Sequence, residues 1–379
     1  MHLDLYIIII SLLGIVVLIN LCYYGVLFSR FSFHKAKKIK HYQQDPVSII
    51  VAAKNDAHHL MKSLPILLTQ QYIDYEVIVV NDNSDDETTQ VAEDFKSIYS
   101  HLKYIDLNSS ITNIKGKKFP ISIGIRAAKN NIILLTEPDA IPNSSYWLQN
   151  MSKHFVDKTE IVLGYATYEK KKGLFNSMLR FDALHTAIQY FSYALAKIPF
   201  MGIGRNLAYT KTLFMKNKGF TSHNHILYGE DDLFINHVAT KTNCAIEYSK
   251  ETIVKTPSKL SFFYWIKFKK NHHLTRKYYQ KKHKFLLGFY EWLSPLFYIF
   301  FIVSLLLMPL ELTLLSALPI GLFFIRILTQ YLIFGFAAVK LREKKLIPYI
   351  LLYDVLFACI NPFINFASKM TRNQDKLWK

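Results

Sequence analysis

Carboxylate side chains follow two apolar runs of this sequence, at positions where they can bind a metal ion and a nucleotide. The first run, Val77–Val80, leads into Asp82, and the second, Ile132–Thr136, leads into Glu137 and Asp139. An uninterrupted apolar run of this length is typical of a strand buried on both faces of a parallel sheet. Open α/β sheets bind ligands beyond the carboxyl ends of their strands. Two acidic strand ends at that edge therefore predict a site for a metal-bound nucleotide.

The surrounding chain alternates between strand-like and helix-like patterns. Strands are expected at 47–51, 76–80, 103–107 and 132–136, and helices at 58–70, 86–100 and 119–129. This alternation predicts an α/β fold whose mostly parallel sheet carries helices on both faces. The polar content between residues 46 and 258 indicates one globular domain with a sizeable core.

Four apolar stretches flank this domain. Residues 5–29 carry no charge and are long enough to cross the roughly 30 Å hydrocarbon core of a bilayer. No basic region precedes them and no convincing cleavage site follows, so we expect an uncleaved anchor rather than a signal peptide. The other three stretches lie at about 286–310, 312–339 and 346–366. The expected order is an anchor (1–29), a basic linker (30–45), the domain (46–258), a basic interfacial segment (259–285), a membrane block of two or three spans (286–368) and a basic tail (369–379).

The net charge of +18 among 379 residues is concentrated beside these apolar stretches. Juxtamembrane bases set membrane orientation and attract anionic lipids, so this pattern argues against nucleic-acid binding. It predicts a multi-pass protein of the cell (inner) membrane with the domain in the cytoplasm. The fourth stretch contains Asp354 and Asn361-Pro362, and it fits either a span or an interfacial segment that returns the basic tail to the cytoplasm. Three cysteines, two of them in apolar stretches, provide neither a disulfide framework nor a zinc site.

Five short motifs follow one another along the chain. They are SIIVAAKND at 48–56, VVNDNSDD at 79–86, KGKK at 115–118, TEPDAIP at 136–142 and YGEDDL at 228–233. In this order, and with membrane segments on both sides, they resemble the membrane-bound, processive-type members of glycosyltransferase family 2, which include cellulose, chitin and hyaluronan synthases. The resemblance covers about residues 47–279. It implies a GT-A-type fold and the transfer of a sugar from a nucleotide-diphosphate sugar, with a UDP-sugar as the expected donor.

The resemblance also assigns the donor side of the site. Asp82 would bind the base ring of the nucleotide, and Asp56 would lie near the ribose. Asp139 would bind Mg²⁺ or Mn²⁺, hard cations that prefer carboxylate oxygens and that neutralise a departing diphosphate. Glu137 stands where the family has its first Asp, and its longer side chain changes the reach of the carboxylate. The expected donor residues are Ala53, Asn55, Asp56, Asp82, Lys117 and Glu137.

On the acceptor side the resemblance points to Asp231 as general base. It would take the proton of the acceptor hydroxyl in a single displacement with inversion, and Glu230 beside it is the second catalytic candidate. Acids in the first turn of a helix are also favourable for the helix dipole alone, so both interpretations of Asp231 stay open. The expected acceptor residues are Gly204, Arg205 and Asn206, together with His272 and Arg276 of the interfacial segment.

One departure from the family concerns this interfacial segment. Processive synthases carry a Gln-x-x-Arg-Trp element there, and residues 265–276 do not contain it. The sequence therefore does not decide between processive and single addition. Two other functions remain as alternatives, a nucleotidyltransferase-like sugar-nucleotide enzyme and a non-catalytic membrane scaffold. A nucleotidyltransferase would need a glycine-rich triphosphate-binding loop before Asn55, and the sequence has none there. A scaffold would need none of the carboxylates that the five motifs contain. The expected role is sugar transfer in polysaccharide biosynthesis.

Overall fold

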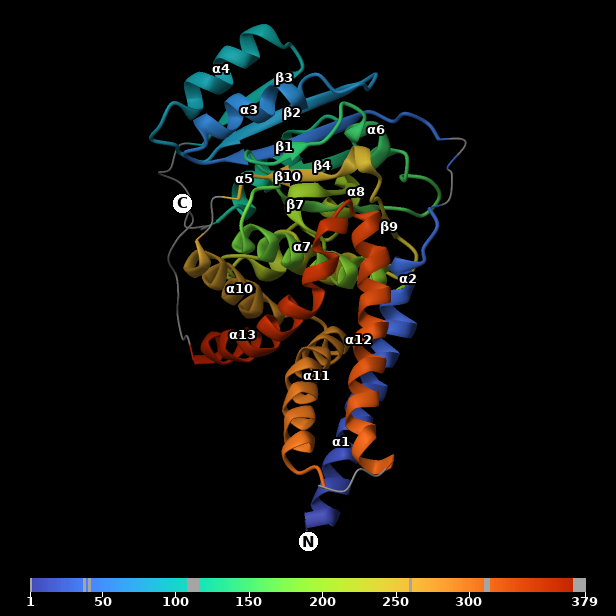
Figure 1. The fold of residues 1–379 in the computed structure, drawn as a ribbon. Coiled ribbons are helices and arrows are strands. Elements are labelled where there is room, and N and C mark those ends of the chain that lie inside the picture. The colour runs from blue at the N-terminus through green and yellow to red at the C-terminus, as the bar shows by residue number, and fades with distance from the viewer. Residues whose placement is uncertain are drawn as a thin grey trace. The chain divides into compact units, whose positions relative to one another are not determined.

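The computed structural model describes residues 2–36, 39, 42–107, 116–258, 261–309 and 314–370 (Figure 1). The chain divides into two compact units. We call residues 36–183 and 193–261 the sheet unit, and residues 1–35, 184–192 and 262–372 the helical unit. The basic residues Lys37, Lys38 and Lys40 and the tail from residue 371 onward lie outside the described residues.

The sheet unit is built on a mixed sheet of seven strands in the order β3-β2-β1-β4-β8-β6-β9. The strands are β1 (Val47–Ala53), β2 (Tyr75–Asn81), β3 (Leu102–Asp106), β4 (Ile132–Thr136), β6 (Ile161–Leu163), β8 (Leu207–Thr210) and β9 (Cys244–Ile246). The pairs β1–β2, β1–β4 and β2–β3 are parallel, whereas β8 is antiparallel to both β4 and β6. The predicted strands and the mostly parallel sheet are thus confirmed, and the short antiparallel β8 is an element that the apolar runs did not indicate.

Helices cover both faces of the parallel part of this sheet. They are α3 (Ala57–Leu67), α4 (Thr88–Ile98), α5 (Lys118–Ala127) and α6 (Trp147–Ser152). Buried side chains of α3, α4 and α6 form one core with Ile49, Val51 and Val77. On the opposite face, Gly124 of α5 lies so close to Ile50 and Val80 that a Cβ would be 2.7 Å and 3.1 Å from their side chains. This double cover explains why the strands are uninterrupted apolar runs.

The sheet unit also contains a second, smaller sheet and further helices. They are a three-stranded sheet of β5 (Ile141–Pro142), β7 (Ala166–Tyr168) and β10 (Val254–Thr256), and the helices α7 (Leu174–Leu195), α8 (Lys211–Lys216) and α9 (Asp232–Val238). Residues 184–192 of α7 belong to the helical unit. The short helix α9 begins directly after Asp231, which places the acidic motif at a helix N-terminus.

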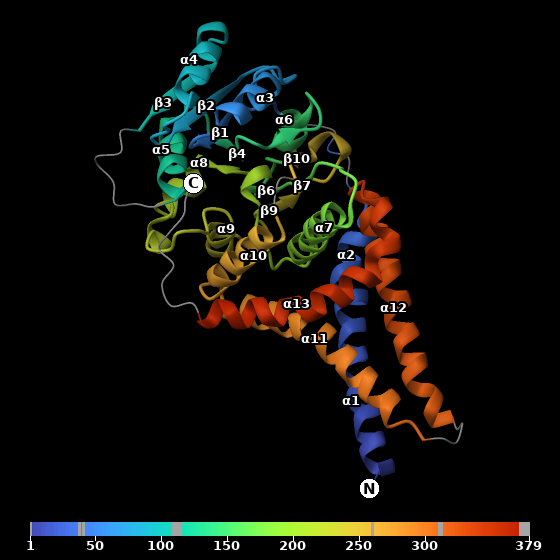
Figure 2. The same ribbon diagram turned by 60° about the vertical axis from the view of Figure 1, so that its left-hand side comes forward.

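The helical unit consists of helices, several of which are long and apolar (Figure 2). They are α1 (His2–Cys22), which continues through the π-helical segment η1 (Tyr23–Phe28) into α2 (Ser29–Ser32), α10 (Phe262–Arg276), α11 (Lys281–Leu306), α12 (Leu314–Lys340), η6 (Lys344–Tyr349) and α13 (Ile350–Met370). Among the described residues, four segments are long and apolar enough to cross a membrane: Leu3–Ser32, Lys281–Leu306, Leu315–Lys340 and Lys344–Ser368. These agree with the four apolar stretches of the sequence.

Candidate active site

The turns that follow β1 and β2 are joined by hydrogen bonds. Asp82 donates its backbone N–H to the carbonyl of Ala53 at 2.8 Å. Asn55 has a φ of 54°, in the left-handed region that Asn tolerates better than most residues. It donates its N–H to Ser84 Oγ at 2.9 Å, and its Oδ1 accepts from the N–H of Asp85 at 2.8 Å. The two strand ends therefore form one hydrogen-bonded edge that includes Asp82, whose contact with a nucleotide base stays a prediction.

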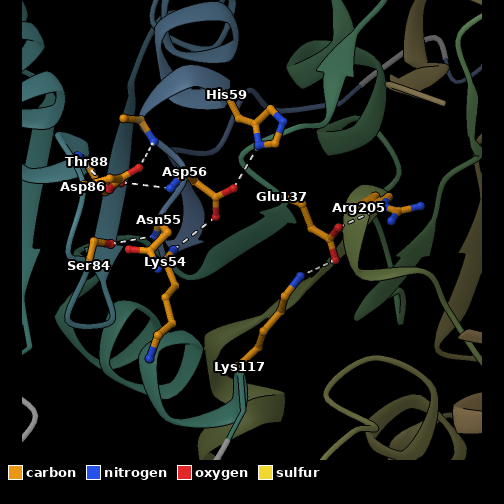
Figure 3. A network of polar contacts seen from close by, with 11 residues as sticks. Lys54, Asn55, Asp56, His59, Ser84, Asp86, Thr88, Lys117, Glu137 and Arg205 are labelled. Carbon is orange, nitrogen blue, oxygen red and sulfur yellow. Dashed lines mark hydrogen bonds and ion pairs between the residues drawn. The ribbon is translucent and has the colours of Figure 1, made fainter. Parts of the chain in front are cut away.

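Asp56 follows in the same turn and is paired with a histidine one helical turn later. Its Oδ1 lies 2.9 Å from His59 Nδ1, and its Oδ2 accepts from the N–H of Lys54 at 3.1 Å (Figure 3). His59 also acts electrostatically on Asp139, whose pKa its positive charge would lower. Sequence reasoning missed His59. The available signal was its position three residues after Asp56, on the first turn of the expected helix.

Glu137 is bound by two cations beyond the end of β4. Its Oε1 lies 2.8 Å from Lys117 Nζ and its Oε2 lies 2.8 Å from Arg205 Nε, and the two bases approach from different sides (Figure 3). Burial alone would raise the pKa of Glu137, but the charges of Lys117 and Arg205 outweigh it and hold this pKa well below its usual range. All three side chains keep between 21% and 24% of their surface exposed. Glu137 is thus a fixed anion with two bases still accessible to a ligand.

Asp139 has the surroundings expected of a metal ligand. Its Oδ1 is buried and has no hydrogen-bond partner in the described part of the chain. Burial raises its pKa, and the positive charge of Arg205 opposes that effect. A buried carboxylate oxygen without a partner is costly, and a bound cation would satisfy it. No group of three or more His, Cys, Asp or Glu side chains suited to a metal occurs among the described residues. The donor set fits Mg²⁺ or Mn²⁺ held by one carboxylate, substrate phosphates and water.

Asp231 is oriented by two backbone amides. Its Oδ2 accepts from the N–H of Gly204 at 2.9 Å, and its Oδ1 accepts from the N–H of Asp232 at 2.6 Å. The second contact caps α9, so Asp231 does lie at a helix N-terminus, where an acid is favourable for the helix dipole. Each carboxylate oxygen has a further lone pair, which allows the same group to accept a proton from an acceptor hydroxyl. The predicted catalytic role is compatible with this geometry and stays a prediction.

Glu230, which precedes Asp231, has a raised pKa. Burial, and next the negative charge of Asp231, raise its pKa to about 7. Lys117 acts in the opposite direction on Glu230, which indicates that the donor-side lysine and the acidic motif share one electrostatic environment.

A buried lysine that the sequence interpretation did not use supports the acidic motif. Lys118 is only 1% exposed, and its Nζ donates to the carbonyls of His223 at 2.7 Å and Ile226 at 2.6 Å. Next to it, Gly116 has a φ of +90°, and a Cβ there would lie 2.5 Å from the carbonyl oxygen of Leu227. Residues 116–118 thus fix the loop that leads into Glu230.

Asn206 does not have the predicted acceptor role. It is fully buried, and its Oδ1 accepts from Trp147 Nε1 at 3.0 Å. Its Nδ2 donates to the carbonyls of Tyr165 at 2.9 Å and Thr252 at 2.7 Å. Since the amide is saturated by the core, the assignment of Asn206 to the acceptor was wrong, and the residue instead fixes the segment that carries Gly204 and Arg205.

The other two expected acceptor residues, His272 and Arg276, belong to α10 of the helical unit. Arg276 Nη1 lies 2.6 Å from Glu291 Oε2, on α11 of the same unit. Their contact with a substrate stays a prediction.

Within the sheet unit, the predicted residues form a connected set. Lys117 and Arg205 meet at Glu137, and Gly204, next to Arg205, binds Asp231. Val51 of β1 pairs with Thr136 of β4, so the turn after β1 and the acids after β4 occupy the same edge of the sheet. This arrangement can hold an anionic, metal-bound ligand beside a carboxylate base.

Comparison with known proteins gives a family match and a shared fold. Residues 48–220 match the family described as Glycosyl transferase family 2. The poly-beta-1,6-N-acetyl-D-glucosamine synthase of Staphylococcus epidermidis is 25% identical over 120 residues, which are 31% of this chain and 28% of that protein. An uncharacterized glycosyltransferase of Rickettsia prowazekii, RP339, is 28% identical over 225 residues, covering 54% of this chain and 68% of that protein. The chain thus matches less than a third of the length of the staphylococcal synthase.

A solved structure shares the fold. The mannosyltransferase PcManGT of Pyrobaculum calidifontis, in complex with GDP-Man and Mn²⁺, superposes with a TM-score of 0.55 at 14% sequence identity. The superposition covers 92% of this chain and 99% of that one.

Proposed function

The chain carries a glycosyltransferase family 2 domain with the GT-A fold, and on this basis we propose that it moves a sugar from a nucleotide-diphosphate sugar to a hydroxyl of a lipid-linked or membrane-proximal glycan. The observation that carries the proposal is the pair of contacts made by adjacent residues, Arg205 to Glu137 and Gly204 to Asp231. Through these two contacts, the segment Gly204-Arg205 links Glu137, on the proposed donor side, with Asp231, the proposed base.

The donor nucleotide would lie along the edge formed by the turns after β1 and β2. Asp82 would accept hydrogen bonds from the base ring, and Asp56, with Ala53 and Asn55 in the same turn, would lie near the ribose. A diphosphate there would interact with the positive charges of Lys117 and Arg205, the two bases that Glu137 already orients. Oriented cations at the position of a developing negative charge stabilise a transition state without reorganisation.

Asp139 would hold the divalent cation, which when bound would neutralise charge on the diphosphate leaving group. The buried and unpartnered Oδ1 of Asp139 supports this assignment. The Mn²⁺ in the complex of the Pyrobaculum mannosyltransferase supports the choice of a hard divalent metal ion, Mg²⁺ or Mn²⁺.

Asp231 would perform the proton transfer. Its carboxylate takes the proton of the acceptor hydroxyl while that oxygen forms a bond to the anomeric carbon. The bond from this carbon to the diphosphate oxygen breaks in the same step, so the configuration is inverted. The amides of Gly204 and Asp232 fix the orientation of the carboxylate, which general-base catalysis requires.

The acceptor class follows from the candidate membrane helices on both sides of the domain in the sequence. A domain tethered in this way samples substrates at the membrane surface, and the basic residues beside the helices favour a cytoplasmic domain. A lipid-linked or membrane-proximal glycan is the acceptor that best fits such a tether.

Hydrolysis of a donor by the purified full-length protein tests the proposal. The protein in detergent would be incubated with UDP-, GDP- and TDP-sugars, each with Mn²⁺, with Mg²⁺ or with EDTA, and nucleoside diphosphate release would be measured. We expect release from one donor class, dependent on the metal and accelerated by a membrane-lipid extract. Release of inorganic pyrophosphate from a nucleoside triphosphate and a sugar phosphate would instead indicate a nucleotidyltransferase. Absence of turnover with every donor would favour a scaffold.

A further inference from the structure

The helical unit buries an ion pair among its helices. Arg326 of α12 is completely buried, and its Nη1 lies 2.8 Å from Asp354 Oδ2 of α13. Ser294 of α11 accepts from Arg326 Nη2 at 2.8 Å and donates to Asp354 Oδ1 at 3.2 Å. Tyr298, also of α11, donates to Asp354 Oδ2 at 2.6 Å. Charges among apolar helices persist only when they are paired in this way. The beginning of α13 is therefore fixed to α11 and α12.

A second polar contact fixes the other end of α13. Asn365 Nδ2 donates to Glu291 Oε2 of α11 at 3.4 Å. The same carboxylate oxygen lies 2.6 Å from Arg276 Nη1 of α10. Helix α13 is thus held to α11 at two positions, Asp354 near its beginning and Asn365 near its end.

The spacing of these two contacts determines the direction of α13. Asp354 and Asn365 are separated by about 16 Å along α13, whereas the partners of Asp354 on α11, Ser294 and Tyr298, lie only about 4.5 Å and 10 Å along that helix from Glu291, the partner of Asn365. Two helices that run side by side would have matching separations, so α13 crosses α11. In Figures 1 and 2, α13 also runs away from the common direction of α1 and α12.

One face of α13 is apolar and exposed. Its residues follow the spacing of a single helical stripe, three or four apart, and are Leu352, Val355, Cys359, Phe363 and Phe366. Phe363 keeps 75% of its surface exposed. On other faces of the helix, Tyr353, Phe357 and Ile364 are buried. Such a stripe requires an apolar cover.

Charge on both sides of α13 identifies this cover. The sequence places Lys344 and Lys345 before the helix and Lys369, Arg372, Lys376 and Lys379 at or after its end. Basic residues stay on the cytoplasmic side and bind anionic headgroups. A membrane-spanning α13 would put one of these two groups on the opposite side of the membrane.

We propose that α1, α11 and α12 cross the membrane, whereas α13 lies in the interface of the cytoplasmic leaflet. Its stripe of Leu352, Val355, Cys359, Phe363 and Phe366 faces the boundary between headgroups and acyl chains of an anionic leaflet, and the buried pair Arg326–Asp354 anchors it there. Amphipathic helices bind membranes by inserting such a face to a depth of about 5–10 Å. The proposal is independent of the proposed sugar transfer.

Cysteine accessibility in intact cells tests the number of crossings. In full-length protein with Cys22, Cys244 and Cys359 replaced by Ser, single cysteines would be introduced as Lys344→Cys, Met308→Cys and Lys376→Cys. We expect an impermeant maleimide to label Met308→Cys directly, and to label Lys344→Cys and Lys376→Cys only after permeabilisation. Labelling of Lys376→Cys in intact cells would show that α13 crosses and would overturn the proposal.

Depth measurements provide a second test that does not depend on the tail. Spin labels would be attached at Leu352→Cys, at the natural Cys359 and at Phe366→Cys, in protein reconstituted in vesicles with anionic lipid. Matched labels on exposed positions of α12, Leu318→Cys, Phe324→Cys and Leu328→Cys, serve as the control for a crossing helix. We expect the α12 labels to change depth by about 1.5 Å per residue and the three α13 labels to stay within a few ångströms of one another. A depth profile through the bilayer centre for α13 would contradict the proposal.

Discussion

Arg205 Nε lies 2.8 Å from Oε2 of Glu137 and joins the segment before β8 to the acids after β4. Glu137 occupies the position at which the family has an Asp, and its other oxygen binds Lys117. Because both oxygens are used by bases, Glu137 orients cations in this arrangement, and Asp139, whose Oδ1 has no partner in the described part of the chain, is the carboxylate that we propose for the metal ion. The acid pair after β4 would then have two different tasks.

The first prediction concerns this metal site. Asp139→Ala should reduce donor turnover by at least about 10²–10³-fold, the usual loss for one electrostatic stabiliser of a transition state. It should also remove the difference in nucleoside diphosphate affinity between Mn²⁺ and EDTA, measured by calorimetry. Asp94→Ala, at an exposed position of α4, is the control and should change neither quantity. Metal-dependent affinity that survives in Asp139→Ala would show that the cation is held elsewhere.

The second prediction concerns the pH dependence of stability. Glu230 has a folded-state pKa of about 7, above the ordinary value of 4.5. The folded protein therefore retains a proton that the unfolded chain loses, and stability falls as the pH rises from about 4.5 to 7, by at most about 3 kcal/mol. Glu230→Gln removes this loss.

Thermal unfolding in detergent checks this prediction. The gain in melting temperature of Glu230→Gln over the parent protein should be larger at pH 8 than at pH 4.5. Glu93→Gln, at an exposed position of α4, should show no such trend. An equal gain at both pH values would mean that Glu230 titrates normally.

The third prediction concerns the buried pair of the helical unit. Arg326→Leu and Asp354→Leu should each destabilise the protein by about 3–5 kcal/mol, because each leaves one buried charge without its partner. The double substitution should recover most of this loss, since no uncompensated charge remains. Melting temperatures of the four proteins in the same detergent provide the measurement. Additive losses in the double variant would mean that the two side chains do not stabilise one another.

Much of the sheet could be predicted, because strands that are buried on both faces appear in the sequence as uninterrupted apolar runs. Residues 132–136 match β4, and the expected helix at 119–129 agrees with α5 to within two residues. The four-residue β8 was missed because Leu207–Thr210 is too short for a periodic pattern, and its pairing depends on β4 and β6.

Side-chain roles were harder to predict than strands. A polar residue beside a Gly-x-Gly sequence is expected at a surface, yet Asn206 turns inward because Trp147 and two carbonyls complete its hydrogen bonds. Lys118 was passed over because local sequence does not reveal that the carbonyls of His223 and Ile226 lie within its reach. Both cases depend on contacts between segments far apart in the chain.

In the proposed reaction, the donor and acceptor carboxylates have separate tasks. Asp231→Asn keeps the size of the side chain but cannot take a proton, so it should lose about 10²–10⁴-fold in transfer rate, the usual share of a general base. Asp82→Asn, the matched change on the donor side, should weaken nucleotide binding and leave a measurable maximal rate at saturating donor.

The most direct measurement is the affinity of Asp231→Asn for the nucleoside diphosphate with Mn²⁺, taken on the same preparation as its transfer rate. We expect an affinity within a few-fold of the parent protein together with the large loss of transfer. An affinity lost as completely as in Asp139→Ala would make Asp231 a donor or metal residue, and would contradict its role as the acceptor base.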